Sequence, residues 1–256
     1  MSKPLSGKHA VVTGGARGIG AAVSRELARL GATVSVMGRE RARLEQFAGA
    51  LAEEFKQPAA FFEVDVARAK SVEENFRACH KQNGSIDILV NNAGISESAP
   101  FLKTSTESWS RMLEVNLNGV FYCTRQVLAP MVERGFGRVV NIASTAGLRG
   151  YRYVAAYCAS KHGVIGLTRA LALELTGKGV TVNSICPGFT NTDLLKNSIA
   201  NVAAKSGRSI EAVRAEFLKD SRSGRFVEPE EIAIKVGWLC LTEQAGINGQ
   251  ELVIEG

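Results

Sequence analysis

Tyr157 and Lys161 are the residues of this chain whose types and spacing point most directly to chemistry. Four residues apart, they share one face of a helix. An ammonium in that place stabilises a phenolate and lowers the tyrosine pKa from about 10 toward neutral pH. Ser144, thirteen residues upstream, adds a hydroxyl that can donate to a developing oxyanion. Taken singly, each residue also has a structural explanation. Tyr157 fits a core aromatic, Lys161 a surface ammonium and Ser144 the cap of a strand end.

A glycine-rich loop near the N-terminus gives these residues a context. Gly14, Gly18 and Gly20 follow a short apolar run. Ile19 lies between the last two glycines, and an amphipathic stretch begins after them. Gly14 permits a tight turn, Gly18 lets the backbone approach a pyrophosphate, and Gly20 permits close packing of helix on strand. The first N–H groups of the helix then face the anion. The alternative is a plain turn between a strand and a helix.

Short apolar runs alternate with amphipathic stretches along the whole chain. The runs are rich in β-branched residues and predict strands over 9–13, 33–37, 59–64, 88–90, 138–142, 180–185 and 251–254. Helices are expected over 19–30, 40–56, 69–82, 106–134, 155–177 and 228–242. This order predicts an α/β fold, a doubly wound parallel sheet of seven strands with helices on both faces. The loops that follow the strands then meet at one edge, where ligands bind.

Composition narrows the classes of function. The chain has 256 residues, 45% of them apolar, and no internal repeat or linker, which predicts a single domain over 1–256. Five scattered cysteines and three separated histidines predict neither a disulfide framework nor a metal site. With no membrane-span pattern and no secretory signal, we expect no membrane partner and a cytoplasmic location. The net charge of +6 is spread among acids, which disfavours nucleic acid and suits a phosphorylated small molecule.

The segment 190–226 departs from the alternation of strands and helices. Its stretches 199–205 and 210–219 predict two helices placed to cover the site as a substrate lid. Seven Lys and Arg against four acids in this segment could attract the phosphates of a thioester substrate. A solvated helix face explains the same pattern.

These motifs together resemble the short-chain dehydrogenase/reductase family over essentially the whole chain. The matching segments are 13–20, Asp65-Val66, Asn91 to Gly94, Asn116, Ser144, Tyr157 to Lys161, Pro187-Gly188 and the closing 248–256. Within the family, the chain looks most like 3-oxoacyl-thioester reductases that act on acyl-carrier-protein or coenzyme A esters. The resemblance implies a Rossmann-like fold, hydride transfer between a nicotinamide and a carbonyl carbon, and a homotetramer.

The resemblance also implies residue roles. Tyr157 donates and accepts the proton, Lys161 lowers its pKa and binds the cofactor ribose, and Ser144 donates to the substrate oxygen. Asn116 holds a water that relays protons to the lysine, while Asn91 braces the sheet. The implied cofactor contacts are Asp65 and Val66 at adenine, Asn92, Ala93 and Gly94 at the ribose, and Pro187, Gly188, Thr190 and Thr192 at the nicotinamide amide. The expected substrate wall consists of Ala146, Leu148, Phe189, Leu194 and Leu195 beside Ser144 and Tyr157.

The charges after the second strand bear on the choice of cofactor. Selectivity for NAD normally uses a carboxylate there, whereas this chain has Arg39. Arg39 and Arg17 suit a ribose 2′-phosphate and predict NADP(H). Alternatively, both arginines are solvated and Glu40 supplies the acid. The rival functions are a catabolic NAD(P)-dependent alcohol or hydroxyacyl-CoA dehydrogenase, and a cofactor-binding sensor without turnover.

Overall fold

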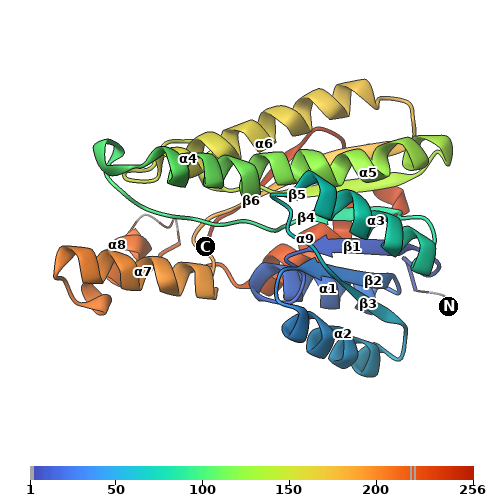
Figure 1. The fold of residues 1–256 in the computed structure, drawn as a ribbon, viewed down its shortest axis with the longest axis horizontal. Helices are drawn as coiled ribbons and strands as arrows, with labels where there is room; N and C mark the ends of the chain where they lie inside the picture. The colour runs from blue at the N-terminus through green and yellow to red at the C-terminus, as the bar shows by residue number, and fades with distance from the viewer. Residues whose placement is uncertain (1–2, 220, 222) are drawn as a thin grey trace.

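The computed structural model describes residues 3–219, 221 and 223–256, and a single parallel sheet runs through them (Figure 1). The seven strands lie in the order β3-β2-β1-β4-β5-β6-β7. Their bounds are β1 (His9–Thr13), β2 (Thr33–Gly38), β3 (Ala59–Glu63), β4 (Ile88–Asn91), β5 (Gly137–Ile142), β6 (Val180–Pro187) and β7 (Glu251–Ile254). The predicted doubly wound sheet is confirmed.

Helices cover both faces of the sheet in two layers (Figure 1). One layer consists of α1 (Gly18–Arg29), α2 (Arg41–Phe55) and α9 (Pro229–Leu239). The other consists of α3 (Ala69–Asn83), α4 (Thr106–Leu113), α5 (Gly119–Glu133) and α6 (Ala155–Glu174). Every residue of β1, β5 and β6 is buried, because helices cover both sides of these strands.

The strand register brings the site together. β5 pairs with β6 from Gly137 opposite Val180 to Ile142 opposite Ile185, and β6 continues two residues further, to Pro187. β4 runs parallel beside β5, and β1 runs parallel on the other side of β4. The glycine loop after β1, the segment after β4, Ser144 after β5 and Gly188 after β6 therefore meet at one edge.

The helix predicted over 106–134 is interrupted. A π-helical turn, η2 (Glu114–Asn118), separates α4 from α5. Asn116 lies in this turn with its side chain buried, where Oδ1 accepts from the backbone N of Ile95 and Nδ2 donates to its O, both at 2.9 Å. A π-turn of this kind often marks a functional position.

The segment predicted to act as a lid contains two helices, α7 (Asp193–Ser206) and α8 (Ile210–Lys219), which extend away from the sheet edge (Figure 1). α8 lies as predicted, but α7 begins at Asp193 rather than at 199 because Thr192 caps it, accepting from the backbone N of Leu195 at 3.5 Å. A bridge between Thr190 and Val227 closes the base of the segment. Asp220 and Arg222, which contribute to its predicted charge balance, lie outside the described residues.

Within the part of the chain that the structure describes, no helix combines the length and apolarity needed to cross a bilayer. The same residues contain no group of three or more His, Cys, Asp or Glu side chains placed to hold a metal ion. The five cysteines are free thiols.

Candidate active site

The four predicted catalytic residues come from three elements at the carboxyl edge of the sheet. Ser144 caps a short 3-10 turn, η3 (Thr145–Gly147), directly after β5. Tyr157 and Lys161 lie in the first turns of α6, and Asn116 lies in η2. A side chain added at Gly94 would lie 3.3 Å from Asn116 Oδ1 and 3.8 Å from Lys161 Nζ. The end of β4 therefore borders both residues.

Lys161 is a buried ammonium. It is 5% exposed, its Nζ donates a 2.8 Å hydrogen bond to Ile142 O, and it lies 5.7 Å from the centre of the Tyr157 ring. Burial lowers the pKa of Lys161 to about 8. The charge of this group therefore titrates close to neutral pH.

Tyr157 is half-buried and keeps its proton at neutral pH. Burial raises the pKa of Tyr157 to about 12, although the Ser144 side chain acts in the opposite direction. The cost of desolvating a phenolate exceeds the stabilisation from Ser144, and the lowering of this pKa by Lys161 stays a prediction. A protonated phenol beside a serine hydroxyl is suited to donate a proton.

The Asn116 side chain links three parts of the site. Besides bonding Ile95, Nδ2 lies 3.1 Å from Ser160 Oγ, which in turn donates to Tyr157 O at 2.8 Å. Asn116 therefore ties the segment after β4 to the turn of α6 that carries Tyr157. Its role in holding a water stays a prediction.

The glycine loop is packed too closely for side chains. A side chain added at Gly20 would lie 2.5 Å from Asn92 Nδ2, and Gly14 adopts a left-handed φ of +63°. Asn92 Nδ2 donates to Thr13 O at 3.0 Å and to Gly14 O at 3.2 Å. Asn92 thus supports the loop with its side chain, and its predicted contact with a ribose stays a prediction.

Thr13 is a support of the loop that sequence reasoning missed. Its Oγ1 accepts from the backbone N of Asn92 at 3.0 Å and of Ala93 at 3.1 Å, which joins the ends of β1 and β4. A hydroxyl at the end of an otherwise apolar strand was the available signal. Asn91 braces the sheet as predicted, since its Nδ2 donates to Thr124 Oγ1 at 3.0 Å and to Asn141 Oδ1 at 2.8 Å.

A family model described as short chain dehydrogenase matches residues 8–203, which contain the glycine loop and all four predicted catalytic residues. The chain belongs to the short-chain dehydrogenase family.

Relatives of this short-chain dehydrogenase match over nearly its full length. A 3-oxoacyl-[acyl-carrier-protein] reductase of Aquifex aeolicus is 35% identical, covering 100% of this chain and 99% of the relative. A D-beta-hydroxybutyrate dehydrogenase of Cupriavidus necator is 36% identical, covering 96% and 95%. The solved structure of an actinorhodin polyketide ketoreductase variant with NADPH is 36% identical, with a TM-score of 0.93 and coverage of 99% and 97%.

As a short-chain dehydrogenase, the chain binds a nicotinamide cofactor, and its sheet edge fits one. The first turn of α1 receives no side-chain cap from Arg17, which leaves its N–H groups available to bind an anion. Gly18, with a φ of +49°, faces the Thr192 methyl, and a side chain there would lie 3.2 Å from that carbon. The loop is therefore a backbone cradle that any added Cβ would fill.

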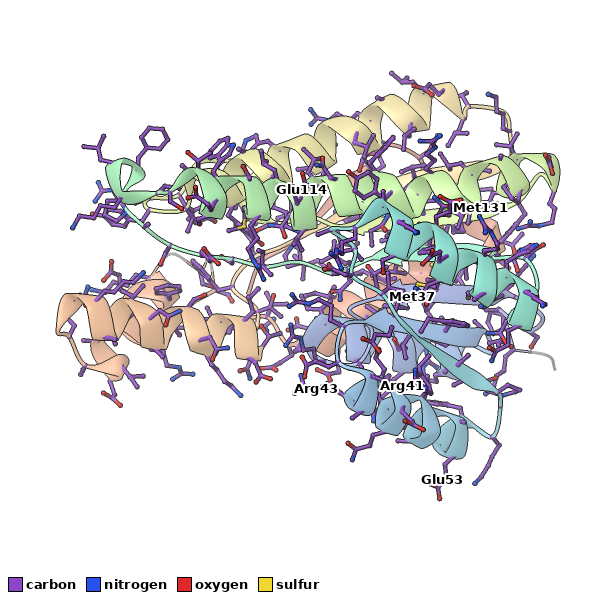
Figure 2. The ribbon with its side chains drawn as sticks, viewed as in Figure 1. Met37, Arg41, Arg43, Glu53, Glu114 and Met131 are labelled. Atoms are coloured by element: carbon purple, nitrogen blue, oxygen red, sulfur yellow. The ribbon has the colours of Figure 1, made fainter. Side chains whose placement is uncertain are left out.

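An ion-pair network occupies the end of β2 in this short-chain dehydrogenase. Glu40 Oε1 lies 3.5 Å from Arg17 Nη1, and Glu40 Oε2 lies 3.4 Å from Arg43 Nη2. Figure 2 shows Arg41 and Arg43 in the first turn of α2. The side chains of Arg17 and Glu40 are 54% and 56% exposed, so this pair contributes little stability. Sequence reasoning missed Arg43, which shares the Glu40 carboxylate.

The remaining predicted cofactor residues follow the same sheet edge. Asp65 Oδ1 accepts from the backbone N of Ala67 at 3.2 Å, and buried Val66 packs against the start of α5. Gly188 N donates to Ile254 O at 2.8 Å directly after Pro187, and Thr190 Oγ1 donates to Gly188 O at 3.0 Å. Their contacts with a cofactor stay predictions.

The predicted substrate wall contains residues beside Ser144 and residues of the segment after β6. Ala146, 4% exposed, lies beside Ser144, while Leu148 and Leu194 are 40% and 45% exposed. Phe189 packs against Tyr151 and Phe217, with ring centres 6.1 and 4.9 Å apart. Leu195 is buried in the lid's own core, so its place in a pocket wall stays a prediction.

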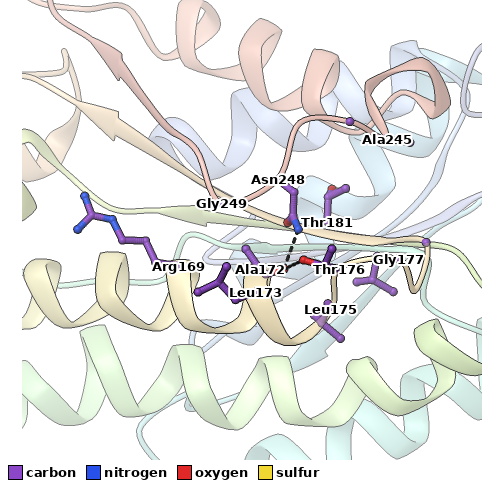
Figure 3. A pocket seen from close by; sticks show the side chains of 13 residues that line it. Arg169, Ala172, Leu173, Leu175, Thr176, Gly177, Thr181, Ala245, Asn248 and Gly249 are labelled. Carbon is purple, nitrogen blue, oxygen red and sulfur yellow. Dashed lines mark hydrogen bonds between the residues drawn. The ribbon is translucent and has the colours of Figure 1, made fainter.

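A hollow of about 650 Å³ lies away from this site, between the last turns of α6 and the segment before β7 (Figure 3). Asn248 Nδ2 donates to Ala172 O across it at 2.9 Å. None of the four predicted catalytic residues lines this hollow.

Proposed function

We propose that this protein is an NADP(H)-dependent reductase that interconverts a ketone and a secondary alcohol, with a 3-oxoacyl thioester or a similar medium-sized ketone as substrate. The meeting of Ser144, Tyr157 and Lys161 beside an anion-binding glycine cradle carries the proposal. When bound, the nicotinamide supplies the hydride. The protein then has to orient the carbonyl and handle the proton.

Each residue has a defined task in this proposal. Ser144, next to Tyr157, donates to the substrate oxygen as negative charge develops on it. Tyr157, with a pKa raised to about 12, holds the proton that this oxygen receives. Lys161, with a pKa near 8, places positive charge behind the phenol and can pass a proton back to it.

The choice of NADP(H) rests on the charges after β2. The pair between Arg17 and Glu40 is exposed and long, so a phosphate dianion can displace Glu40 from Arg17. Arg39 is exposed in the same segment. The solved relative with NADPH agrees with this choice.

An NAD-dependent dehydrogenase working toward oxidation is the second candidate. Glu40 favours it, because a carboxylate after β2 suits a ribose hydroxyl, and one relative is a hydroxybutyrate dehydrogenase. We also propose that 190–226 acts as a substrate lid, and that the protein is a cytoplasmic homotetramer.

The test compares NADPH and NADH oxidation with 3-oxoacyl-CoA esters and simple ketones. The proposal expects NADPH preference with thioester turnover, and at least a hundredfold loss of kcat in Tyr157→Phe. Glu40→Gln should leave NADPH turnover intact, whereas Arg17→Ala together with Arg39→Ala should raise the KM for NADPH more than that for NADH. Preference for NADH that Glu40→Gln removes would favour the second candidate.

A further inference from the structure

The loop between η3 and α6, residues 148–154, is tied to the end of the sheet by a chain of polar side chains. Arg149 Nη2 lies 3.1 Å from Glu255 Oε1, just beyond β7. Arg149 Nε donates to Tyr151 OH at 2.9 Å, and Tyr151 OH lies 2.9 Å from Thr145 Oγ1. Thr145, 6% exposed, directly follows Ser144.

We infer that Glu255, Arg149, Tyr151 and Thr145, here called the brace, position Ser144 against the substrate carbonyl. The inference rests on the proposed function, since it assigns Ser144 a bond to the reacting oxygen. It adds Tyr151 and Thr145 as positioning residues that act through Ser144.

The geometry of η3 explains why Ser144 needs such support. Its hydroxyl accepts from the backbone N of Ala146 at 3.1 Å, so its orientation follows the turn. One side of the turn is packed on α6, where a side chain added at Gly147 would lie 2.7 Å from Lys161 O. The Thr145 hydroxyl, held by Tyr151, fixes the turn from another direction. An oxyanion donor works only when held within about 0.5 Å of its productive place.

The same loop is held at two further points. Tyr153 has a left-handed φ of +66°, unusual for an aromatic residue, and its O accepts from Ala99 N at 2.8 Å. The Tyr151 ring meets Phe189, which contacts Phe217 of α8. The brace thus connects the lid to the turn that carries Ser144.

The test uses substitutions that remove single hydroxyls. Tyr151→Phe keeps the ring, Thr145→Val keeps the shape, and Thr145→Ser restores the hydroxyl. We expect kcat to fall roughly five- to tenfold in the first two with little change in KM, because a misplaced Ser144 loses a bond that is strongest in the transition state. Thr145→Ser should recover most of the rate. The double variant should be no slower than either single variant, since both break the same link.

The matched control is a similar Arg–Glu pair whose glutamate begins β7. Arg169 Nε lies 2.8 Å from Glu251 Oε1 on the opposite end of the strand, and its side chain is 61% exposed against 48% for Arg149. Arg169→Met should leave kcat near the wild-type value, whereas Arg149→Met should lower it as Tyr151→Phe does. Thermal unfolding of all variants separates loss of rate from loss of fold.

Two results would overturn the inference. One is a Tyr151→Phe enzyme with the kcat of Arg169→Met. The other is additive losses in the double variant. Undiminished turnover in Tyr157→Phe would instead remove the proposed function itself, and the role of the brace with it.

Discussion

At the scale of one residue, Lys161 carries a charge that the proposed chemistry needs and whose burial lowers the stability of the folded protein. Its ammonium is buried with a backbone carbonyl as its hydrogen-bond partner, and burial lowers its pKa from 10.5 to about 8. Below pH 8 the charge is present in both the folded and the unfolded state, so the full cost of burying it falls on the folded state. Between pH 8 and 10.5 the folded protein releases the proton first, so that stability rises with pH.

We predict that Lys161→Met abolishes turnover yet stabilises the protein at pH 7. The shift in pKa corresponds to about 3 kcal/mol of desolvation cost, which the variant no longer carries. The hydrogen bond from Lys161 to Ile142 O is lost as well, and this loss offsets part of the gain. Chemical denaturation at pH 7 and pH 9.5 measures this. The advantage of the variant should shrink at the higher pH, and an advantage that does not depend on pH would contradict the assigned pKa.

Glycine positions give a second prediction at this scale. Gly20→Ala should destabilise the protein by about 1–3 kcal/mol and weaken cofactor binding at least tenfold, because the added carbon clashes with the backbone O of Gly14 and lies 2.5 Å from Asn92 Nδ2. Gly49→Ala is the control, since nothing lies within 4 Å of the added carbon in exposed α2. It should stabilise by about 0.5–1 kcal/mol. Fluorescence titration with NADPH and thermal unfolding measure both effects.

At the scale of elements, the first helix of the proposed lid, α7, begins at a side-chain cap. Thr192 accepts from Leu195 N and donates to Thr190 O at 3.3 Å, while its methyl group faces Gly18. The same residue therefore begins the lid and borders the cofactor cradle. Loss of its hydroxyl should be felt in both places.

We predict that Thr192→Val loosens the lid and raises the KM for substrate. A lost cap costs about 1 kcal/mol, which should appear as faster proteolysis within α7 and not as global unfolding. Thr192→Ser keeps the hydroxyl and should behave like the wild type in proteolysis. Equal protection of α7 in the Val and Ser variants would show that the cap does not hold the lid.

The elements also show what could be predicted from the chain alone. Strands such as β5 and β6 were found because short runs rich in Val and Ile contrast with their surroundings. The π-turn at Asn116 was missed because it preserves the amphipathic pattern of the helices on either side. The role of Thr192 as a cap was missed because it was assigned to the cofactor. The high pKa of Tyr157 and the pairing of Arg17 with Glu40 depend on burial and distance, which spacing does not reveal.

At the scale of the whole molecule, a buried histidine makes the free energy of unfolding depend on pH in the acid range. His9 is 4% exposed, its Nε2 lies 2.9 Å from Ser35 Oγ, and its Nδ1 is among the buried atoms without a hydrogen-bond partner in the described residues. Burial lowers the pKa of His9, with a smaller contribution from His80, and outweighs the backbone of Gly84 and Ser85 and the charge of Asp87, which raise it. Cys79, whose pKa burial raises to about 11, also faces the ring and stays neutral.

We predict that the free energy of unfolding falls as the pH drops below about 6.5, where the unfolded chain takes up a proton that the buried ring resists. His9→Gln removes this dependence and should flatten the slope between pH 7 and pH 5. Urea unfolding across this range measures the two slopes. Parallel slopes would mean that carboxylates alone set the acid limit.

The bridge between Thr190 and Val227 brings the two ends of the lid segment side by side. Everything between them, α7 and α8 with their separate apolar cluster, is inserted at one point of the framework. Such an insertion is exchangeable: a longer, shorter or differently lined segment joined at the same two residues leaves the strand register unchanged, provided that it keeps the contacts of Thr192 with Gly18 and of Phe217 with Phe189. New substrate ranges can therefore arise, by evolution or by grafting, without rebuilding the chemistry beneath.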